Sequence, residues 1–145
     1  MKTCVWMIAM AAASASAAAQ SSPAGLWQTI DDSTGQPRAE VRISDAAGVL
    51  TGRIERSLTP VPGGGQLRCA LCLDDRRNQP LIGLDIVRRL VPGSDPQTWE
   101  GGEILDPDSG KTYRLRVRLK DSGRLLEVRG FVGPFFRNQT WVRLP

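Results

Sequence analysis

Cys69 and Cys72 are the residues of this 145-residue chain whose type and spacing come closest to a chemical motif. Two thiols at this spacing form a short-loop disulfide in an oxidising compartment, act as a redox pair, or bind a soft ion such as Cu(I). A redox pair ordinarily lies at a helix N-terminus, which lowers the thiol pKa, and the sequence predicts no helix at Cys69. We therefore expect a structural disulfide between Cys69 and Cys72, while the redox and soft-metal interpretations stay open.

The chain contains no histidine. Its absence excludes Ser-His-Asp and Cys-His mechanisms as well as histidine metal sites. Carboxylate pairs such as Asp74 with Asp75, and Asp106 with Asp108, fall in predicted loops, where acidic residues ordinarily form turns. We predict no catalytic residue, no metal site and no cofactor, and we expect that the protein is not an enzyme.

The beginning of the chain has the pattern of a secretory signal peptide. Lys2 supplies a positive start, an apolar segment follows, and three alanines precede Gln20. The apolar segment is too short to span a bilayer, and no other part of the sequence is a candidate span. We predict a signal peptide over residues 1–19, a single exported domain over residues 20–145, and a periplasmic or secreted location without an integral membrane segment in the mature chain.

The charge balance is mildly basic. The formal net charge is +4 for the whole chain, and removal of Lys2 with the signal peptide lowers it by one. The basic residues alternate along predicted strands and form no patch with stacking aromatic residues, which a nucleic-acid-binding surface would require. We expect no nucleic-acid partner. Arg116 opposite Arg129 is a like-charge pair that either holds an anion or extends into water.

Three consecutive antiparallel strands are predicted over residues 99–132. Residues 113–120 alternate between apolar and basic side chains, the period of a half-buried strand. Turn residues at 107–110 and around Ser122 and Gly123 fix the register, because a one-residue slip would exchange the two faces. The predicted outward pairs are Glu103 with Arg114, Trp99 with Arg118, and Arg118 with Glu127.

Another hairpin is predicted over residues 38–55. Closure at Ser44 with Val49 places Val41 opposite Gly52 and leaves a four-residue loop that ends in Gly48. Further strands are expected at residues 25–31, 83–91 and 138–144, separated by one irregular connection at about 58–80 that contains Cys69 and Cys72. The predicted fold is all-β, an eight-stranded antiparallel up-and-down barrel, with a small or open barrel, or a two-layer sheet, as the alternative.

Several short motifs resemble the bacterial domain-of-unknown-function family 2147. The resemblance covers nearly the whole mature chain and implies a small exported protein without an established activity. Its motifs are Gly25-Leu26-Trp27, Cys69-x-x-Cys72, Pro80-Leu81-Ile82-Gly83-Leu84, Trp99-x-Gly101-Gly102-x-Ile104-x-Asp106-Pro107 with Gly110-Lys111-x-Tyr113, Val128-Arg129-Gly130-Phe131-Val132-Gly133 and Gln139-Thr140-Trp141. Residues 134–138 depart from the family pattern, which more often has leucines, glycine and threonine there.

A second resemblance, at the level of the fold, is to lipocalin-like barrels. These barrels often carry Gly-x-Trp on the first strand and a basic residue on the last strand that packs over the tryptophan. Gly25-Leu26-Trp27 and Arg143 match these two positions. The resemblance implies that Trp27 and Arg143 close the barrel; the alternative is an ordinary core tryptophan and an ordinary surface arginine.

Three functions are compatible with these features. The first is a non-enzymatic binding module for a small apolar or amphiphilic ligand, in which Gly52, Gly102 and Gly130 leave interior space and Tyr113 and Glu100 supply polar contacts. The second is an envelope protein-interaction module in which Phe135 and Phe136 are the contact, unless they fold back into the barrel end. The third is a thiol redox or soft-metal module that uses Cys69 and Cys72.

Overall fold

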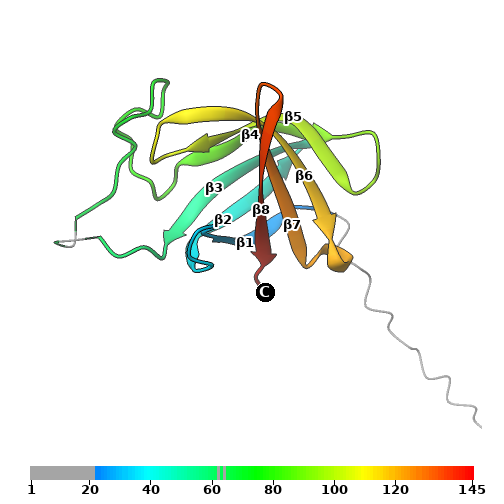
Figure 1. The fold of residues 1–145 in the computed structure, drawn as a ribbon, viewed down its shortest axis with the longest axis horizontal. Helices are drawn as coiled ribbons and strands as arrows, with labels where there is room; N and C mark the ends of the chain where they lie inside the picture. Colours follow the sequence, from blue (N-terminus) through cyan, green and yellow to red (C-terminus); the bar gives the residue numbers. More distant parts are fainter. Residues whose placement is uncertain (1–21, 62, 64) are drawn as a thin grey trace, which may run out of the picture.

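Eight antiparallel strands form a closed barrel in which each strand pairs with its neighbours in the chain and the last pairs with the first (Figure 1). The computed structural model describes residues 22–61, 63 and 65–145. The predicted signal peptide, residues 1–19, lies outside the described residues. The strands are β1 (Gly25–Ile30), β2 (Pro37–Ala46), β3 (Val49–Ser57), β4 (Asp85–Pro92), β5 (Thr98–Asp106), β6 (Lys111–Lys120), β7 (Leu125–Val132) and β8 (Phe135–Arg143).

The predicted all-β, up-and-down barrel is therefore confirmed, and so is most of the register of its central block. Asp106 pairs with Lys111, Glu103 with Arg114, and Arg118 with Glu127. The four-residue turn between β6 and β7 includes the short 3₁₀ turn η2 (Asp121–Gly123). Glu127 does not form an ion pair with Arg118, its partner in the ladder. Its carboxylate instead binds Lys120 at 2.7 Å and Arg129 at 3.8 Å.

The predicted outward position of Trp99 is wrong. Thr98, and not Trp99, pairs with Arg118, and the register shifts between Trp99 and Gly102. Gly101 within this irregularity has a φ of +77°, a left-handed conformation that glycine adopts without strain. The extra residue turns the indole of Trp99 into the core, where the residue is 8% exposed.

The predicted closure of the β2–β3 hairpin is also wrong, by two residues. Ala46 pairs with Val49, so the turn consists of Ala47 and Gly48 alone. Both residues have positive φ, +53° and +86°, as the tightest hairpin turns require. The register differs from the predicted one by two residues, and an even shift leaves each side chain on the same face of the sheet. Val41 and Gly52 therefore still point inward, although Val41 pairs with Ile54 and not with Gly52.

Inward side chains fill the barrel from its middle to one end. The inward residues that are at most 2% exposed are Trp27, Val41, Ile43, Leu50, Val87, Leu90, Leu115, Val117, Leu126 and Trp141. We call this end the closed end; it carries the β2–β3, β4–β5 and β6–β7 turns. The opposite end, which we call the mouth, carries the β1–β2, β5–β6 and β7–β8 turns and the long β3–β4 connection.

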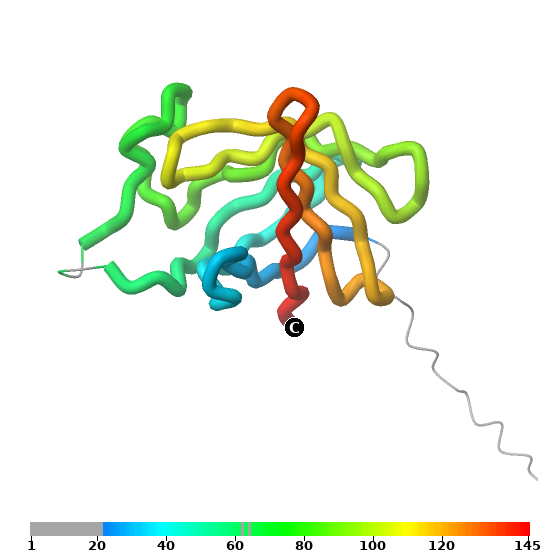
Figure 2. The backbone as a smooth tube through the Cα atoms, viewed as in Figure 1, coloured from blue at the N-terminus to red at the C-terminus, as the bar shows by residue number. Residues whose placement is uncertain are grey.

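The β3–β4 connection folds back against the barrel beside the β5–β6 turn (Figure 2). A Cβ atom on Gly110 of that turn would collide with the carbonyl group of Leu71, which shows how closely the two backbones approach. Leu105 has outward parity, yet it is only 3% exposed. The connection therefore covers the outside of the sheet at this point and buries apolar surface there.

Candidate functional site

The closed end is sealed by an arginine stacked on a tryptophan. The guanidinium carbon of Arg143 lies 4.3 Å from the centroid of the Trp27 ring. The same guanidinium donates hydrogen bonds to the carbonyl oxygens of Ser22, Ala24 and Gly123, at 2.6, 2.9 and 2.7 Å. Burial lowers the pKa of Arg143. Arg143 thus joins the first strand, the last strand and the β6–β7 turn, the arrangement that the lipocalin-like resemblance implied.

Two of the glycines expected to leave interior space do not leave it. A Cβ atom on Gly52 would lie 2.9 Å from Cβ of Val87, so the side chain of Val87 occupies that volume. At Gly102 the Cβ atom would lie 2.6 Å from the carbonyl oxygen of Arg88 and 2.9 Å from the backbone nitrogen of Leu90. These glycines permit close approach of β4, and no deep ligand cavity can be centred on them.

Glu100, expected as an interior polar contact, lies on the outside of the barrel. It follows the inward Trp99 within the β5 irregularity, is exposed, and lines an outer groove with residues of β6 and β7. The sequence pattern misplaced it because it assumed unbroken alternation along β5.

The mouth is where inward side chains become partly exposed. Tyr113 and Gly130, both predicted as ligand contacts, lie together here: a Cβ atom on Gly130 would lie 3.5 Å from Cβ of Tyr113 and 3.8 Å from Ile104. These are ordinary van der Waals distances, so the site next to Gly130 has room for a side chain. The partly exposed inward residues at this end are Thr29, Ala39, Ile104, Tyr113, Gly130 and Gln139.

Gln139 is a mouth residue that the sequence analysis did not identify. Its side-chain oxygen accepts a hydrogen bond of 3.4 Å from the indole nitrogen of Trp141, the next inward residue of β8. The amide NH₂ group adds donors at the floor of the mouth. Alternation along the predicted strand 138–144 could have indicated Gln139, because Gln139 lies two residues before the apolar Trp141 and so on the same face.

The rim of the mouth is held by ionic contacts. Arg137 of β8 binds Asp32 of the β1–β2 turn at 2.7 Å. In the same turn Asp31 accepts hydrogen bonds from the Ser33 hydroxyl and from the backbone N–H groups of Ser33 and Thr34. These bonds stabilise the carboxylate and lower the pKa of Asp31 to about 2. These polar contacts therefore fix the β1–β2 turn and β8 on one side of the mouth, whose partly buried apolar residues include Ala39 and Ile104.

Cys69 and Cys72 are joined by a disulfide inside the β3–β4 connection. Both are buried, at 0% and 1% exposure, and Sγ of Cys69 lies 3.8 Å from the carbonyl oxygen of Pro107 in the β5–β6 turn. A redox or metal-binding pair needs access to its reaction partner. The position of this disulfide instead fits a clamp that fixes the connection against the neighbouring turn.

Arg76 is a second fixing point of this connection, and the sequence analysis did not single it out. It is 2% exposed, its guanidinium forms hydrogen bonds of 2.5 to 3.1 Å with the Asp74 carboxylate, and it donates one of 2.8 Å to the carbonyl oxygen of Asp85. A weaker contact of 3.6 Å reaches Glu103 on β5. Arg76 thus ties the connection to β4 and β5. The Arg76 contact also lowers the pKa of Asp74 to about 2.

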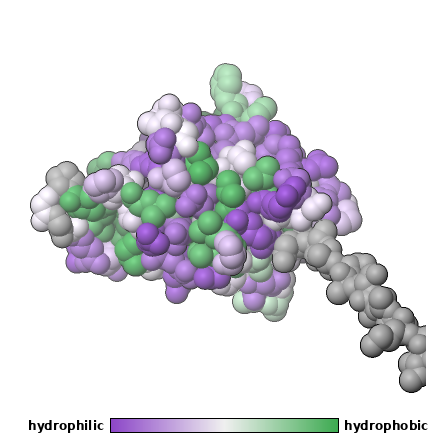
Figure 3. Space-filling model, turned by 90° about the horizontal axis from the view of Figure 1, so that it is seen from below, coloured by the Kyte–Doolittle hydropathy of each residue, from purple (hydrophilic) through white to green (hydrophobic). Residues whose placement is uncertain are grey.

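The two neighbouring phenylalanines belong to β8 and do not fold into the barrel. Phe135 is 75% and Phe136 56% exposed, as is Val132 opposite them at 56%. Phe136 lies against Phe131 with ring centroids 6.3 Å apart. The proposed alternative, that these rings close the barrel end, is therefore wrong. In the surface view of Figure 3, apolar groups are interspersed with polar ones.

Some features of an active or membrane site were not found in the described part of the chain. No group of three or more cysteine, aspartate or glutamate side chains is arranged to hold a metal ion among residues 22–61, 63 and 65–145. Within the same residues, no helix has the length and apolarity needed to cross a bilayer.

The closed eight-stranded up-and-down barrel, with an arginine stacked on the first-strand tryptophan, has a lipocalin-like fold. The solved structure of protein HP1028 from Helicobacter pylori, described as belonging to the lipocalin family, matches with a TM-score of 0.72 and 21% sequence identity over 87% of this chain and 85% of that chain. Residues 25–143 match the model of the protein family DUF2147, whose description is 'uncharacterized protein conserved in bacteria'. The chain belongs to this family. No curated protein sequence matched.

Proposed function

We propose that this protein binds a small apolar or amphiphilic molecule at the mouth of its barrel and performs no chemistry on it. The observation that carries the proposal is the change in exposure along the barrel axis. Inward residues are fully buried from the closed end to the middle, whereas Tyr113, Gly130 and the other inward residues of the mouth are partly exposed. A lipocalin-like barrel is a fold that can hold one small ligand.

The chemistry of the mouth supports a ligand with two unlike ends. Ala39 and Ile104 pack against the core and provide an apolar floor, while Tyr113, Gln139 and Thr29 offer hydroxyl and amide groups. Apolar lining with a few polar groups is typical of small-molecule sites. Because Val87 and the β4 backbone fill the space beside Gly52 and Gly102, the ligand sits at the mouth and does not enter deeply.

Titration with the neutral fluorescent probe N-phenyl-1-naphthylamine tests this site. The probe should bind the purified protein with a saturable rise in emission, and Gly130→Leu should weaken binding at least ten-fold by filling the mouth. Thr140→Leu is the matched control, since it places the same side chain on an exposed outer position of β8. Equal binding by the wild type and Gly130→Leu, with both proteins folded, would reject the mouth as the site.

The location proposed with this function is the periplasm or the exterior of the cell. It rests on the predicted signal peptide over residues 1–19. Expression of the full chain followed by fractionation and N-terminal sequencing tests it; the mature protein should begin at Gln20. Full-length material confined to the cytoplasm would contradict export.

A second candidate function is binding to a protein of the cell envelope through the β7–β8 hairpin. The observation that favours it is the exposure of Phe135 at the end of that hairpin, beside Val132. A photo-crosslinking residue at position 135 should yield a discrete adduct in intact cells, and the same residue at position 140 should not. The buried disulfide Cys69–Cys72 lends no comparable support to a thiol or metal module.

A further inference from the structure

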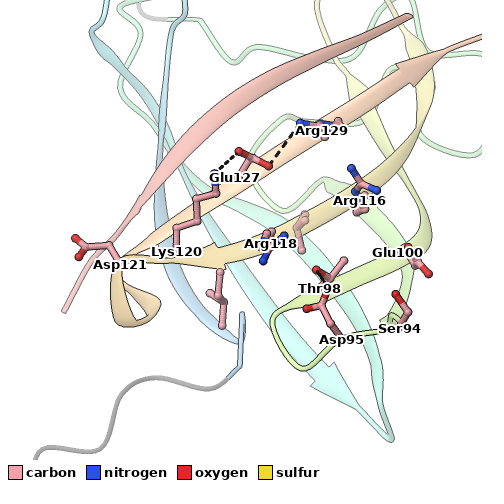
Figure 4. A pocket seen from close by; sticks show the side chains of 12 residues that line it. Ser94, Asp95, Thr98, Glu100, Arg116, Arg118, Lys120, Asp121, Glu127 and Arg129 are labelled. Atoms are coloured by element: carbon pink, nitrogen blue, oxygen red, sulfur yellow. Dashed lines mark hydrogen bonds and ion pairs between the residues drawn. The ribbon is translucent and has the colours of Figure 1, made fainter. Parts of the chain in front are cut away.

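A polar groove of about 650 Å³ lies on the outside of the barrel over β5, β6 and β7 (Figure 4). Its floor is the outward face of β6, and the β4–β5 turn forms one wall. The charged and hydroxyl side chains that line it are Ser94, Asp95, Thr98, Glu100, Arg116, Arg118, Lys120, Asp121, Glu127 and Arg129. Its volume lies within the roughly 300–1,000 Å³ of typical small-molecule sites.

Most carboxylates of the groove already have partners. Glu127 binds Lys120 at 2.7 Å and Arg129 at 3.8 Å, and Asp121 binds Arg124 at 2.6 Å. The oxygens of Asp95 accept hydrogen bonds of 2.9 Å from the Gln97 backbone N–H and the Thr98 hydroxyl. Asp95 is thereby held by its own turn.

Arg116 and Arg118 are the cations of the groove that lack a carboxylate. Among the residues that the structure describes, no carboxylate oxygen lies within 4.0 Å of either guanidinium, so neither forms an ion pair. The two residues alternate with Leu115 and Val117 on β6, so both point into the groove.

The cross-strand partner of Arg116 is another arginine. Arg116 pairs directly with Arg129 of β7, and like charges at opposed positions of a sheet are destabilising. Arg116 is nevertheless only half exposed, and its guanidinium carbon lies 5.6 Å from the Phe131 ring centroid. The guanidinium carbon of Arg129 lies 4.2 Å from the Phe136 ring centroid, and its Nε donates a hydrogen bond of 2.7 Å to Asn138 Oδ1 on β8. Aromatic rings therefore hold both arginines, and both line the same groove.

We propose that Arg116 and Arg118, with Arg129 beside them, form a binding site for the oxyanion of a small hydroxylated molecule, such as a phosphorylated sugar. Asp95 and Glu127 attract these cations only from beyond ion-pair distance, and a phosphate would give Arg116 and Arg118 the direct ion pair that neither has, because guanidinium groups bind phosphate oxygens with two parallel hydrogen bonds. Ser94, Thr98 and Glu100 on the opposite wall offer partners for hydroxyl groups. This site is separate from the mouth, on the outer face of the same barrel.

Isothermal titration calorimetry with glucose 6-phosphate tests the proposal, with glucose as the probe that lacks the anion. The wild type should bind glucose 6-phosphate saturably at low ionic strength and should bind glucose at least ten-fold more weakly. The double variant Arg116→Gln/Arg118→Gln should lose at least ten-fold in affinity for glucose 6-phosphate. Both changes are outside the core, so the barrel should remain folded.

Arg77→Gln combined with Arg68→Gln is the matched control. Both arginines are exposed in the β3–β4 connection, so this variant loses the same charge without altering the groove, and it should bind like the wild type. The proposal is overturned if the wild type shows no saturable binding, if the groove variant retains wild-type affinity, if glucose binds as tightly as its phosphate, or if the control variant loses affinity equally. The neutral probe used for the mouth should bind the groove variant normally, which separates failure of this site from failure of the mouth.

Discussion

Arg143 of the last strand stacks on Trp27 of the first, with 4.3 Å between the guanidinium carbon and the ring centroid. The contact joins the two strands at which an up-and-down sheet must close. Among the described residues, the β1–β8 ladder has two residue pairs, Trp27 with Arg143 and Gln28 with Val142. Side-chain contacts therefore reinforce the seam with the fewest paired residues.

Arg143→Ala should lower the free energy of unfolding by about 2 to 4 kcal/mol. A cation–π contact contributes roughly 0.5–2 kcal/mol, and a carbonyl oxygen left without its buried partner adds about 1–3 kcal/mol. Urea unfolding followed by tryptophan fluorescence measures the change. Arg124→Ala, at an exposed arginine of the neighbouring turn, should change stability by less than about 1 kcal/mol; equal effects of the two variants would contradict this role of Arg143.

Arg76→Met should loosen the β3–β4 connection before it unfolds the barrel. The substitution leaves Asp74 and the Asp85 carbonyl oxygen without their shared partner, whereas Arg77→Met, at an exposed neighbour, leaves these contacts intact. Limited proteolysis should cleave Arg76→Met within residues 58–84 at a protease concentration that spares Arg77→Met. Cleavage of both variants at the same rate would show that Arg76 does not fix the connection.

The disulfide should resist reduction in the folded protein. Cys69 and Cys72 are buried, so a thiolate reductant reaches them only when the connection opens. Alkylation and mass measurement should find no free thiol in native, unreduced protein and two after reduction in denaturant. Removal of the disulfide should lower the free energy of unfolding by about 2 kcal/mol, because the bond closes a very short loop. Two alkylated thiols in unreduced, denatured protein would disprove the bond.

Gly102 and Gly130 should respond in opposite ways to replacement by alanine. At Gly102 the new methyl group would lie 2.6 Å from the Arg88 carbonyl oxygen, so we expect a loss of about 3 kcal/mol, the upper end for overpacking. At Gly130 the nearest atom, Cβ of Tyr113, is 3.5 Å away, and alanine should be neutral or stabilise the strand by about 0.5–1 kcal/mol. Urea unfolding of both variants measures the change in the free energy of unfolding. Similar losses of stability at Gly102 and Gly130 would contradict the packing described.

Stability should be lost in acid and change little near neutrality. The pKa values of Asp31 and Asp74 are lowered from 3.8 to about 2 in the folded protein, so both contribute stability above pH 4 that disappears as the pH falls toward 2. The chain has no histidine to titrate between pH 5 and 8. Urea midpoints should thus be flat from pH 7 to 5 and fall below pH 4, and Asp31→Asn/Asp74→Asn should flatten that fall. An identical pH dependence in the double variant would exclude these carboxylates as its source.

The sequence by itself determined the strand order, the barrel and most of the face assignments. Alternation along residues 113–120 is a local property, and turn residues such as Pro107 and Gly110 fix the adjacent pairing. The absence of histidine likewise follows from the sequence alone and excludes histidine-dependent catalysis and metal binding. The Gly25-x-Trp27 motif and Arg143 indicated the closing contact through resemblance.

Only the tertiary structure decided which inward positions are open and which are filled. Gly52 and Gly130 look alike in sequence, but Val87 from β4 fills the space at Gly52, while Gly130 faces the mouth. The bulge at Gly101 turns Trp99 inward. The two-residue turn that begins at Ala47 shifts the register of the β2–β3 hairpin. The sequence did not predict either feature, because backbone irregularities depend on partner strands and on conformations that residue type alone does not specify. The burial of Arg76, and the gathering of Arg116, Arg118 and the β4–β5 turn around one groove, arise from contacts between segments distant in the chain.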